Sequence, residues 1–121
     1  MPVTPDIEEF FGHDRVALDL ARAVIELIDR TGAVESRVTK SQVAFRSRKG
    51  FAYLWCPGRY VASDVPVVLS IALPERLDSS RFKSVVHPAP RVWMHHLELR
   101  GIDQVDAEVA DWLATAHQAA S

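Results

Sequence analysis

Residues 37–60, RVTKSQVAFRSRKGFAYLWCPGRY, decide the fold class of this chain. An extended strand over residues 37–48 would turn Val43 and Phe45 to one face of a sheet. The opposite face would carry basic and amide side chains, namely Lys40, Gln42, Arg46 and Arg48. Lys49-Gly50 then indicates a hairpin turn, residues 51–56 predict the returning strand, and Pro57-Gly58 ends it. The centre of the chain is therefore predicted to be antiparallel sheet.

Helical periodicity flanks this central region on both sides. Thr4-Pro5-Asp6 predicts the start of a short helix that ends at Phe11. A longer helix is predicted from residue 13 or 14 to Thr31-Gly32, with a buried stripe of Val16, Leu20, Val24, Leu27 and Ile28. Asp103 is the expected N-cap of a last helix. The buried stripe of that helix would be Val105, Val109, Trp112, Leu113 and Ala116.

Three further segments with strand character lie between the hairpin and the last helix: residues 65–73, 82–87 and 92–100. We therefore expect a single α+β domain that spans residues 1–121. Its N- and C-terminal helices would pack on one face of a sheet of four to five mostly antiparallel strands.

Composition excludes several classes of protein. The chain has 121 residues, of which 48% are hydrophobic and 25% charged, as in ordinary globular domains. It has no apolar run of membrane-spanning length and no secretory signal, and the single cysteine, Cys56, excludes an internal disulfide. We therefore expect a cytoplasmic protein without a membrane partner. The net charge of −2 argues against a general nucleic-acid binder and leaves any such role to a local basic stretch.

Such a stretch exists between Arg37 and Tyr60, which contains no acidic residue. Its basic residues are Arg37, Lys40, Arg46, Arg48, Lys49 and Arg59, and its aromatic residues are Phe45, Phe51, Tyr53, Trp55 and Tyr60. The segments at both ends of the chain are acidic. This distribution predicts a basic and aromatic sheet face as the binding surface.

The hairpin register decides whether the aromatic side chains join that face. A three-residue loop, residues 48–50, would place Phe51, Tyr53 and Trp55 in the core. A two-residue Lys49-Gly50 loop would move all three to the basic face, beside the guanidinium groups. Turn chemistry favours the first closure, because two-residue hairpins prefer Asn-Gly or Asp-Gly, but the sequence leaves both open.

Several short segments resemble a family of uncharacterised bacterial domains known as domain of unknown function 5655. They are IEEFF at residues 7–11, KSQVAFR at 40–46 followed by FA at 51–52, HHLEL at 95–99 and VDAEVADWL at 105–113. The resemblance covers nearly the whole chain and implies a compact α+β domain. It brings no established activity, so it assigns no catalytic residue.

The remaining reactive side chains form no recognisable catalytic motif. His95 and His96 are neighbours on a strand and point to opposite faces, which predicts a core His95 and an accessible His96. Cys56 is expected to be a small buried side chain, and a metal site that combines His13, His87 and His96 is disfavoured. The predicted ligand-binding residues are Lys40, Arg46, Arg48, Tyr53, Trp55 and His96. No catalytic residue, metal or cofactor is assigned.

Three functions remain open. The favoured hypothesis is a non-enzymatic binding or accessory module that uses the basic sheet face for an acidic ligand or macromolecule. The alternative is a homo-oligomeric interaction domain without a small-molecule site. An enzyme built on His96, Cys56 and the arginines has the least support.

Overall fold

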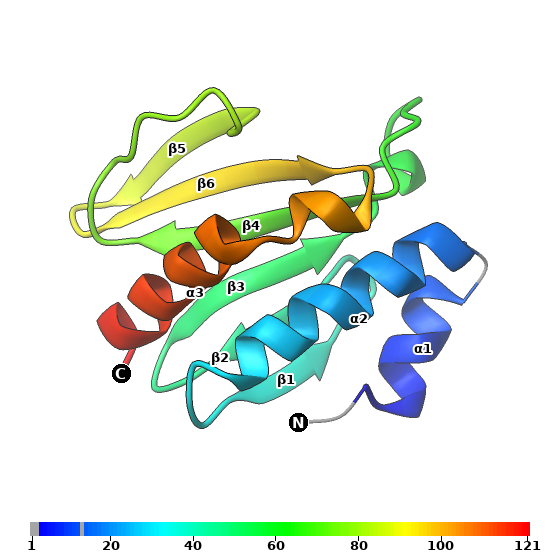
Figure 1. Cartoon of the computed structure of the whole chain (residues 1–121), viewed down its shortest axis with the longest axis horizontal. Helices are drawn as coiled ribbons and strands as arrows, with labels where there is room; N and C mark the ends of the chain where they lie inside the picture. Colours follow the sequence, from blue (N-terminus) through cyan, green and yellow to red (C-terminus); the bar gives the residue numbers. More distant parts are fainter. Residues whose placement is uncertain (1–2, 13) are drawn as a thin grey trace.

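The structure, a computed structural model, describes residues 3–12 and 14–121 as three helices and a six-stranded sheet (Figure 1). Helices α1 (Pro5–Phe11) and α2 (Arg15–Asp29) come first, and α3 (Ala107–Ala119) ends the fold. The strands are β1 (Glu35–Val38), β2 (Val43–Arg46), β3 (Gly50–Trp55), β4 (Val67–Leu73), β5 (Ser84–Ala89) and β6 (Val92–Leu99). Two short 3₁₀ turns, η1 (Pro57–Arg59) and η2 (Ile102–Gln104), follow β3 and β6.

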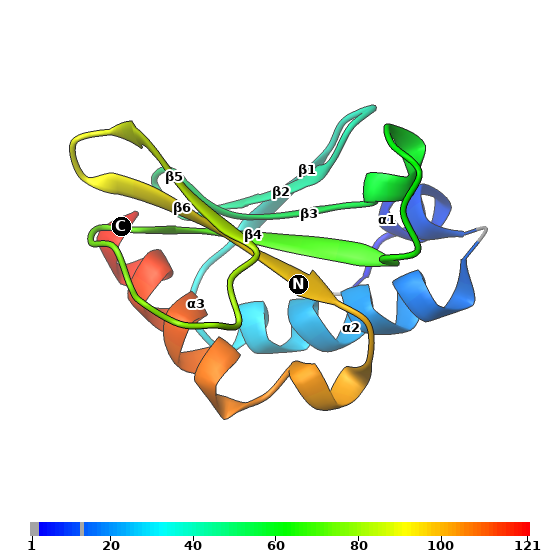
Figure 2. The ribbon, with the colours of Figure 1, turned by 90° about the horizontal axis from the view of Figure 1, so that it is seen from above.

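The sheet has the order β1-β2-β3-β4-β6-β5, and every neighbouring pair is antiparallel. Helices α2 and α3 lie side by side on one face, and no α-helix of the described residues covers the other face (Figure 2). The core between the layers includes Leu20, Leu54, Leu69, Leu97 and Leu113, each 0–1% exposed. The predicted α+β architecture, with its terminal helices on one face of the sheet, is confirmed.

The prediction of one strand over residues 37–48 is wrong, which is why the sheet has six strands instead of four to five. A turn at Thr39–Gln42 divides that segment into β1 and β2. The Thr39 N–H donates to the Gln42 carbonyl (2.9 Å), and Thr39 Oγ1 accepts from the N–H groups of Ser41 and Gln42. Threonine thus offers the backbone a local alternative to the strand ladder. Lys40 consequently lies in a turn.

Both predicted hairpin closures are wrong as well. Phe45 pairs with Ala52 and Arg46 pairs with Gly50, so a β-bulge leaves Phe51 without a partner on β2. The loop is residues 47–49, and its tip is held by Ala120, the C-cap residue of α3: the N–H groups of Arg48 and Lys49 both donate to the Ala120 carbonyl (3.0 and 2.9 Å). The bulge breaks the alternation along β3. Phe51 is therefore buried in the core, whereas Tyr53 lies on the helix-free face.

The helices depart from expectation in the buried stripe of α2, where Leu27 is only half-buried, and at the start of α3. Val16 is 50% exposed, because the buried face of α2 is formed by Ala17, Leu20, Ala21, Val24, Ile25 and Ile28. Asp106, and not Asp103, is the N-cap of α3, and its carboxylate accepts from the Val109 N–H (3.1 Å). Burial of Val109, Trp112, Leu113 and Ala116 on α3 is confirmed, whereas Val105 before it is half-buried.

Candidate functional site

The helix-free face of the sheet carries a row of residues in register across neighbouring strands. Ala44 on β2 pairs with Arg37 on β1 and with Tyr53 on β3. Tyr53 pairs in turn with Ser70 on β4, which pairs with His96 on β6. Side chains that project from one face of paired strands are near neighbours. The ladder therefore gathers one cation, one phenol, one hydroxyl and one imidazole from four strands.

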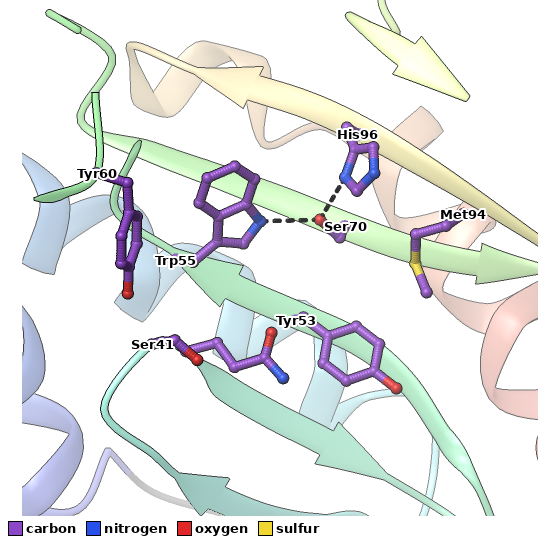
Figure 3. A pocket seen from close by; sticks show the side chains of 8 residues that line it. Ser41, Tyr53, Trp55, Tyr60, Ser70, Met94 and His96 are labelled. Carbon is purple, nitrogen blue, oxygen red and sulfur yellow. Dashed lines mark hydrogen bonds between the residues drawn. The ribbon is translucent and has the colours of Figure 1, made fainter. Parts of the chain in front are cut away.

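A pocket of about 520 Å³ lies over the centre of this row (Figure 3). It combines aromatic and polar side chains: Ser41, Gln42, Tyr53, Trp55, Tyr60, Ser70, Met94 and His96. We call it the open-face pocket. Its volume falls within the range of small-molecule sites, and its mixture of rings with a few polar groups is typical of them.

A second hollow of about 610 Å³ shares Trp55, Tyr60 and His96 with the open-face pocket. Its remaining lining comes from η1 and the loop after it, from β4, from the start of β5 with the residue before it, and from β6: Pro57, Val61, Ala62, Ser63, Val68, Lys83, Ser84 and Glu98. Tyr60 reaches both hollows because η1 turns the chain back beside the sheet. Arg59 anchors this turn: its guanidinium lies over the Phe10 ring, 4.1 Å from the centroid, and donates to the Phe10 carbonyl.

A hydrogen-bond chain crosses the floor of the open-face pocket. Trp55 Nε1–H donates to Ser70 Oγ (3.0 Å), and Ser70 Oγ lies 2.7 Å from His96 Nδ1 (Figure 3). The Trp55 and His96 rings also meet edge to face, with centroids 6.4 Å apart. Two side chains that face the pocket are therefore held in place by a serine that is itself 3% exposed.

The surroundings of His96 favour the neutral form of its imidazole. Burial lowers its pKa below the ordinary value of about 6.5, and the nearby His95 lowers the pKa further. A neutral imidazole carries one N–H and one bare nitrogen, so it offers one donor and one acceptor. The pocket thus presents hydrogen-bonding groups without a fixed charge at its floor.

The structure brings together three of the six predicted ligand-binding residues, namely Tyr53, Trp55 and His96. It does not join Lys40, Arg46 and Arg48 to them as one stripe. Lys40 lies in the β1–β2 turn at one end of β2, whereas Arg46 and Arg48 lie at the other end, where Arg46 Nη2 donates to the Arg48 carbonyl (2.8 Å). The cation in register with the pocket is Arg37.

Five residues of the pocket were not among the predicted ligand-binding residues: Ser41, Gln42, Tyr60, Ser70 and Met94. One signal was available for Ser70, because it is the only polar residue in the apolar segment VVLSIAL. Alternation along β4 turns Ser70 to the face opposite Leu69 and Ile71. The other residues come from turns and from β6, and their approach to Tyr53 depends on the tertiary structure.

Other reactive side chains have structural roles. Buried His95 donates from Nδ1 to the Trp93 carbonyl (2.8 Å), and its Nε2 accepts from the Leu77 N–H (3.0 Å), which confirms it as a core histidine. Cys56 is half-buried, and burial raises the pKa of its thiol. Arg81 joins the segment before β5 to α3 through Asp106 and Glu108.

Two findings concern membranes and metals. Among residues 3–12 and 14–121, no helix has the length and apolar character needed to cross a membrane. The same residues contain no group of three or more His, Cys, Asp or Glu side chains placed to hold a metal ion. The metal site considered above also involves His13, which lies outside the described residues.

Comparison with known proteins places the chain in one family. No curated protein and no solved structure matches it. A family described as "Domain of unknown function (DUF5655)" matches residues 7–120, which include all three helices except the first two residues of α1, every strand of the sheet and the whole open-face pocket. The chain therefore belongs to the DUF5655 family.

Proposed function

We propose that this protein is a non-enzymatic binding module that holds a small, planar, acidic molecule in the open-face pocket. The observation that carries the proposal is the presence of three aromatic side chains, Tyr53, Trp55 and Tyr60, around a hollow of about 520 Å³ on a helix-free sheet face. Such rings stack on flat ligands, and stacking on a base contributes about 1–3 kcal/mol. The polar groups of Gln42 and His96 would orient the ligand.

The acidic group of the ligand is assigned to the Arg37 side of the pocket. Arg37 is exposed and belongs to the same row as Tyr53. The second hollow contains Lys83 but also Glu98, so its charges oppose each other. A small anion is favoured over a nucleic-acid strand because the whole chain carries a net charge of −2. The single half-buried cysteine supports a cytoplasmic location for this activity.

Titration with a panel of nucleoside 5′-monophosphates at low salt tests this function. We expect the amide and side-chain resonances of Tyr53, Trp55 and His96 to shift on binding. Trp55→Leu should weaken binding at least about fivefold, the lower end of the loss of one stacked ring. The matched control is Trp93→Leu, because Trp93 stacks on His87 away from the pocket. Equal losses in both variants, or no binding by any nucleotide, would reject the proposal.

A homo-oligomeric interaction domain is the second candidate. Three apolar side chains lie exposed around the pocket: Tyr60, Val61 and Val86. Val86 is in register with Met94, so it belongs to the same sheet face. Light scattering over a range of concentrations decides this alternative. A dimer that Val61→Asp converts to a monomer would favour it over the binding module.

A further inference from the structure

We propose that Ser70 is a positioning residue that holds His96 in the tautomer with its proton on Nε2. In that tautomer the open-face pocket donates a hydrogen bond from His96 and selects ligands that carry an acceptor at this position. The tautomer of His96 is a property of the folded protein alone. The ligand selection rests on the proposed function, because it requires that a planar molecule occupies the pocket.

The hydrogen bonds of the Ser70 hydroxyl determine which atom donates in its contact with His96. A serine hydroxyl has one proton to donate and two lone pairs. The Trp55 indole nitrogen can only donate, so the 3.0 Å contact occupies a lone pair of Ser70 Oγ. The other contact of Oγ is with His96 Nδ1 at 2.7 Å. The hydroxyl proton remains available, and Nδ1 lies where it can accept it.

The opposite assignment leaves a buried donor without an acceptor. If His96 carried its proton on Nδ1 and donated to Ser70, the hydroxyl proton would need a third partner. Ser70 is 3% exposed, and the described part of the chain gives its hydroxyl no partners besides Trp55 and His96. Strand β4 is paired on both sides, with β3 and with β6, so nearby backbone carbonyls are used in the ladders. Buried polar groups are nearly always paired, which favours donation from Ser70.

The consequence for the pocket follows from the second ring nitrogen. With Nδ1 accepting, the neutral ring carries its proton on Nε2. No described residue bonds to Nε2, and the described residues contain no buried side-chain nitrogen without a partner. His96 Nε2 is therefore accessible from outside, and His96 lines both hollows. A ligand there meets an N–H donor of fixed direction.

This geometry favours one class of planar ligand. A ring nitrogen, a ring carbonyl or an acid oxygen can accept from Nε2–H, whereas an amino or ring N–H group cannot. A ligand that places a donor against this N–H would leave two donors facing each other, which is costly where the bound ligand shields them from water. Burial, which lowers the pKa of His96, keeps the ring in the neutral state that this selection requires.

The tautomer is measured directly by the ¹⁵N chemical shifts of the His96 ring above pH 7. In the wild type we expect Nδ1 to resonate as a bare nitrogen and Nε2 as a protonated one. In Ser70→Ala the two shifts should move toward the average of exchanging tautomers. Ser41→Ala is the matched control, because Ser41 lines the same pocket without a bond to His96. Ser70→Thr should keep the wild-type shifts, because threonine retains the hydroxyl group. A protonated Nδ1 in the wild type would overturn the inference.

Ligand selection is tested with two neutral bicyclic probes, quinoline and indole. Quinoline presents a ring acceptor and indole a ring N–H. We expect the wild type to bind quinoline about fivefold or more tightly than indole, the factor that corresponds to one hydrogen bond of about 1 kcal/mol. The preference should disappear in His96→Phe, which keeps a ring but no donor. Equal affinity in the wild type overturns the selection. If neither probe binds, the selection fails, while the nucleotide titration still decides the planar-ligand function and the ¹⁵N measurement still decides the role of Ser70.

Discussion

Two adjacent residues, His95 and His96, show how strand alternation assigns different chemistry to one residue type. His95 points into the core, where Leu77 and Trp93 satisfy both ring nitrogens. His96 points to the helix-free face and shares Ser70 with Trp55. The opposite orientations were predictable because successive side chains along a regular strand point to opposite faces of the sheet. The partners were not, because Leu77 and Ser70 are distant in sequence.

His95 predicts a pH dependence of stability. Burial lowers the pKa of His95, and protonation of Nε2 would break its bond with the Leu77 N–H. Between this lowered pKa and the unfolded value of about 6.5, the unfolded chain binds more protons than the folded one. The stabilisation is therefore fully present above about pH 6.5 and is lost as the pH falls toward the folded pKa.

Urea denaturation at a series of pH values between about 7 and 5 measures this effect. We expect the free energy of unfolding to fall with pH in the wild type and to fall less steeply in His95→Gln, whose amide does not titrate. His87→Gln is the control, because His87 is exposed and stacks on Trp93 at the β5–β6 hairpin. An unchanged slope in His95→Gln would contradict the argument.

At the scale of secondary structure, the bulge between β2 and β3 creates the aromatic part of the pocket. Simple alternation would place Phe51, Tyr53 and Trp55 on one face, and either hairpin closure keeps them together. The bulge lets Phe51 enter the core while Tyr53 and Trp55 remain on the helix-free face. Its cause lies partly outside the hairpin, because α3 binds the loop through Ala120. Local turn rules could not predict this register, because a residue near the C-terminal end of the chain holds the loop.

Gly50 leaves room for the Tyr53 side chain, and this predicts a specific effect on binding. A methyl group at Gly50 would collide with the Tyr53 hydroxyl. Gly50→Ala should therefore displace Tyr53 and weaken nucleotide binding, and Tyr53→Phe in the same chain should restore part of the affinity. Gly58→Ala is the matched control, because the added methyl group would meet only the Ser63 carbonyl at 3.4 Å, an ordinary contact. A failure of Tyr53→Phe to rescue Gly50→Ala would disprove the steric explanation.

Trp112 on α3 packs against Phe82 in the segment before β5, which predicts a large loss of stability when the Trp112 side chain is truncated. The Trp112 ring lies 4.6 Å from the Phe82 ring and is 9% exposed. Trp112→Ala should cost about 3–5 kcal/mol of unfolding free energy, typical of a buried aromatic replaced by alanine. Chemical denaturation measures it, with half-buried Trp93→Ala as a milder comparison. A loss below about 1 kcal/mol would show that Trp112 is not a core residue.

At the scale of the whole molecule, the sequence predicts the packing of the helices on the sheet better than it predicts the residues of the open-face pocket. The periodicities of Leu20 and Val24 on α2, and of Trp112 and Leu113 on α3, assign both helices to the core correctly. The strand number differs because Thr39 introduces a turn that the alternating pattern conceals. The open-face pocket needs β3, β4 and β6 in register with two turns, and this arrangement is a property of the assembled sheet.

In the folded sheet, the arginine nearest to the open-face pocket in register is not part of the basic stripe that the sequence predicts. Arg37 lies in the same row as Tyr53, whereas Arg48 lies in the β2–β3 loop, whose backbone is held by α3. We therefore expect Arg37→Glu to weaken binding of adenosine 5′-monophosphate about three- to tenfold, as for reversal of an exposed charge near an anion. Arg48→Glu should have a smaller effect.

Isothermal titration at two salt concentrations compares these variants. The effect of Arg37→Glu should shrink at high salt, because screening weakens an exposed charge interaction. Arg48→Glu changes the net charge by the same amount, so it controls for long-range attraction of the anion to the whole molecule. Equal losses in both variants would mean that only the overall charge matters. A larger loss in Arg48→Glu would place the anion at the hairpin tip and would favour the basic stripe over the open-face pocket.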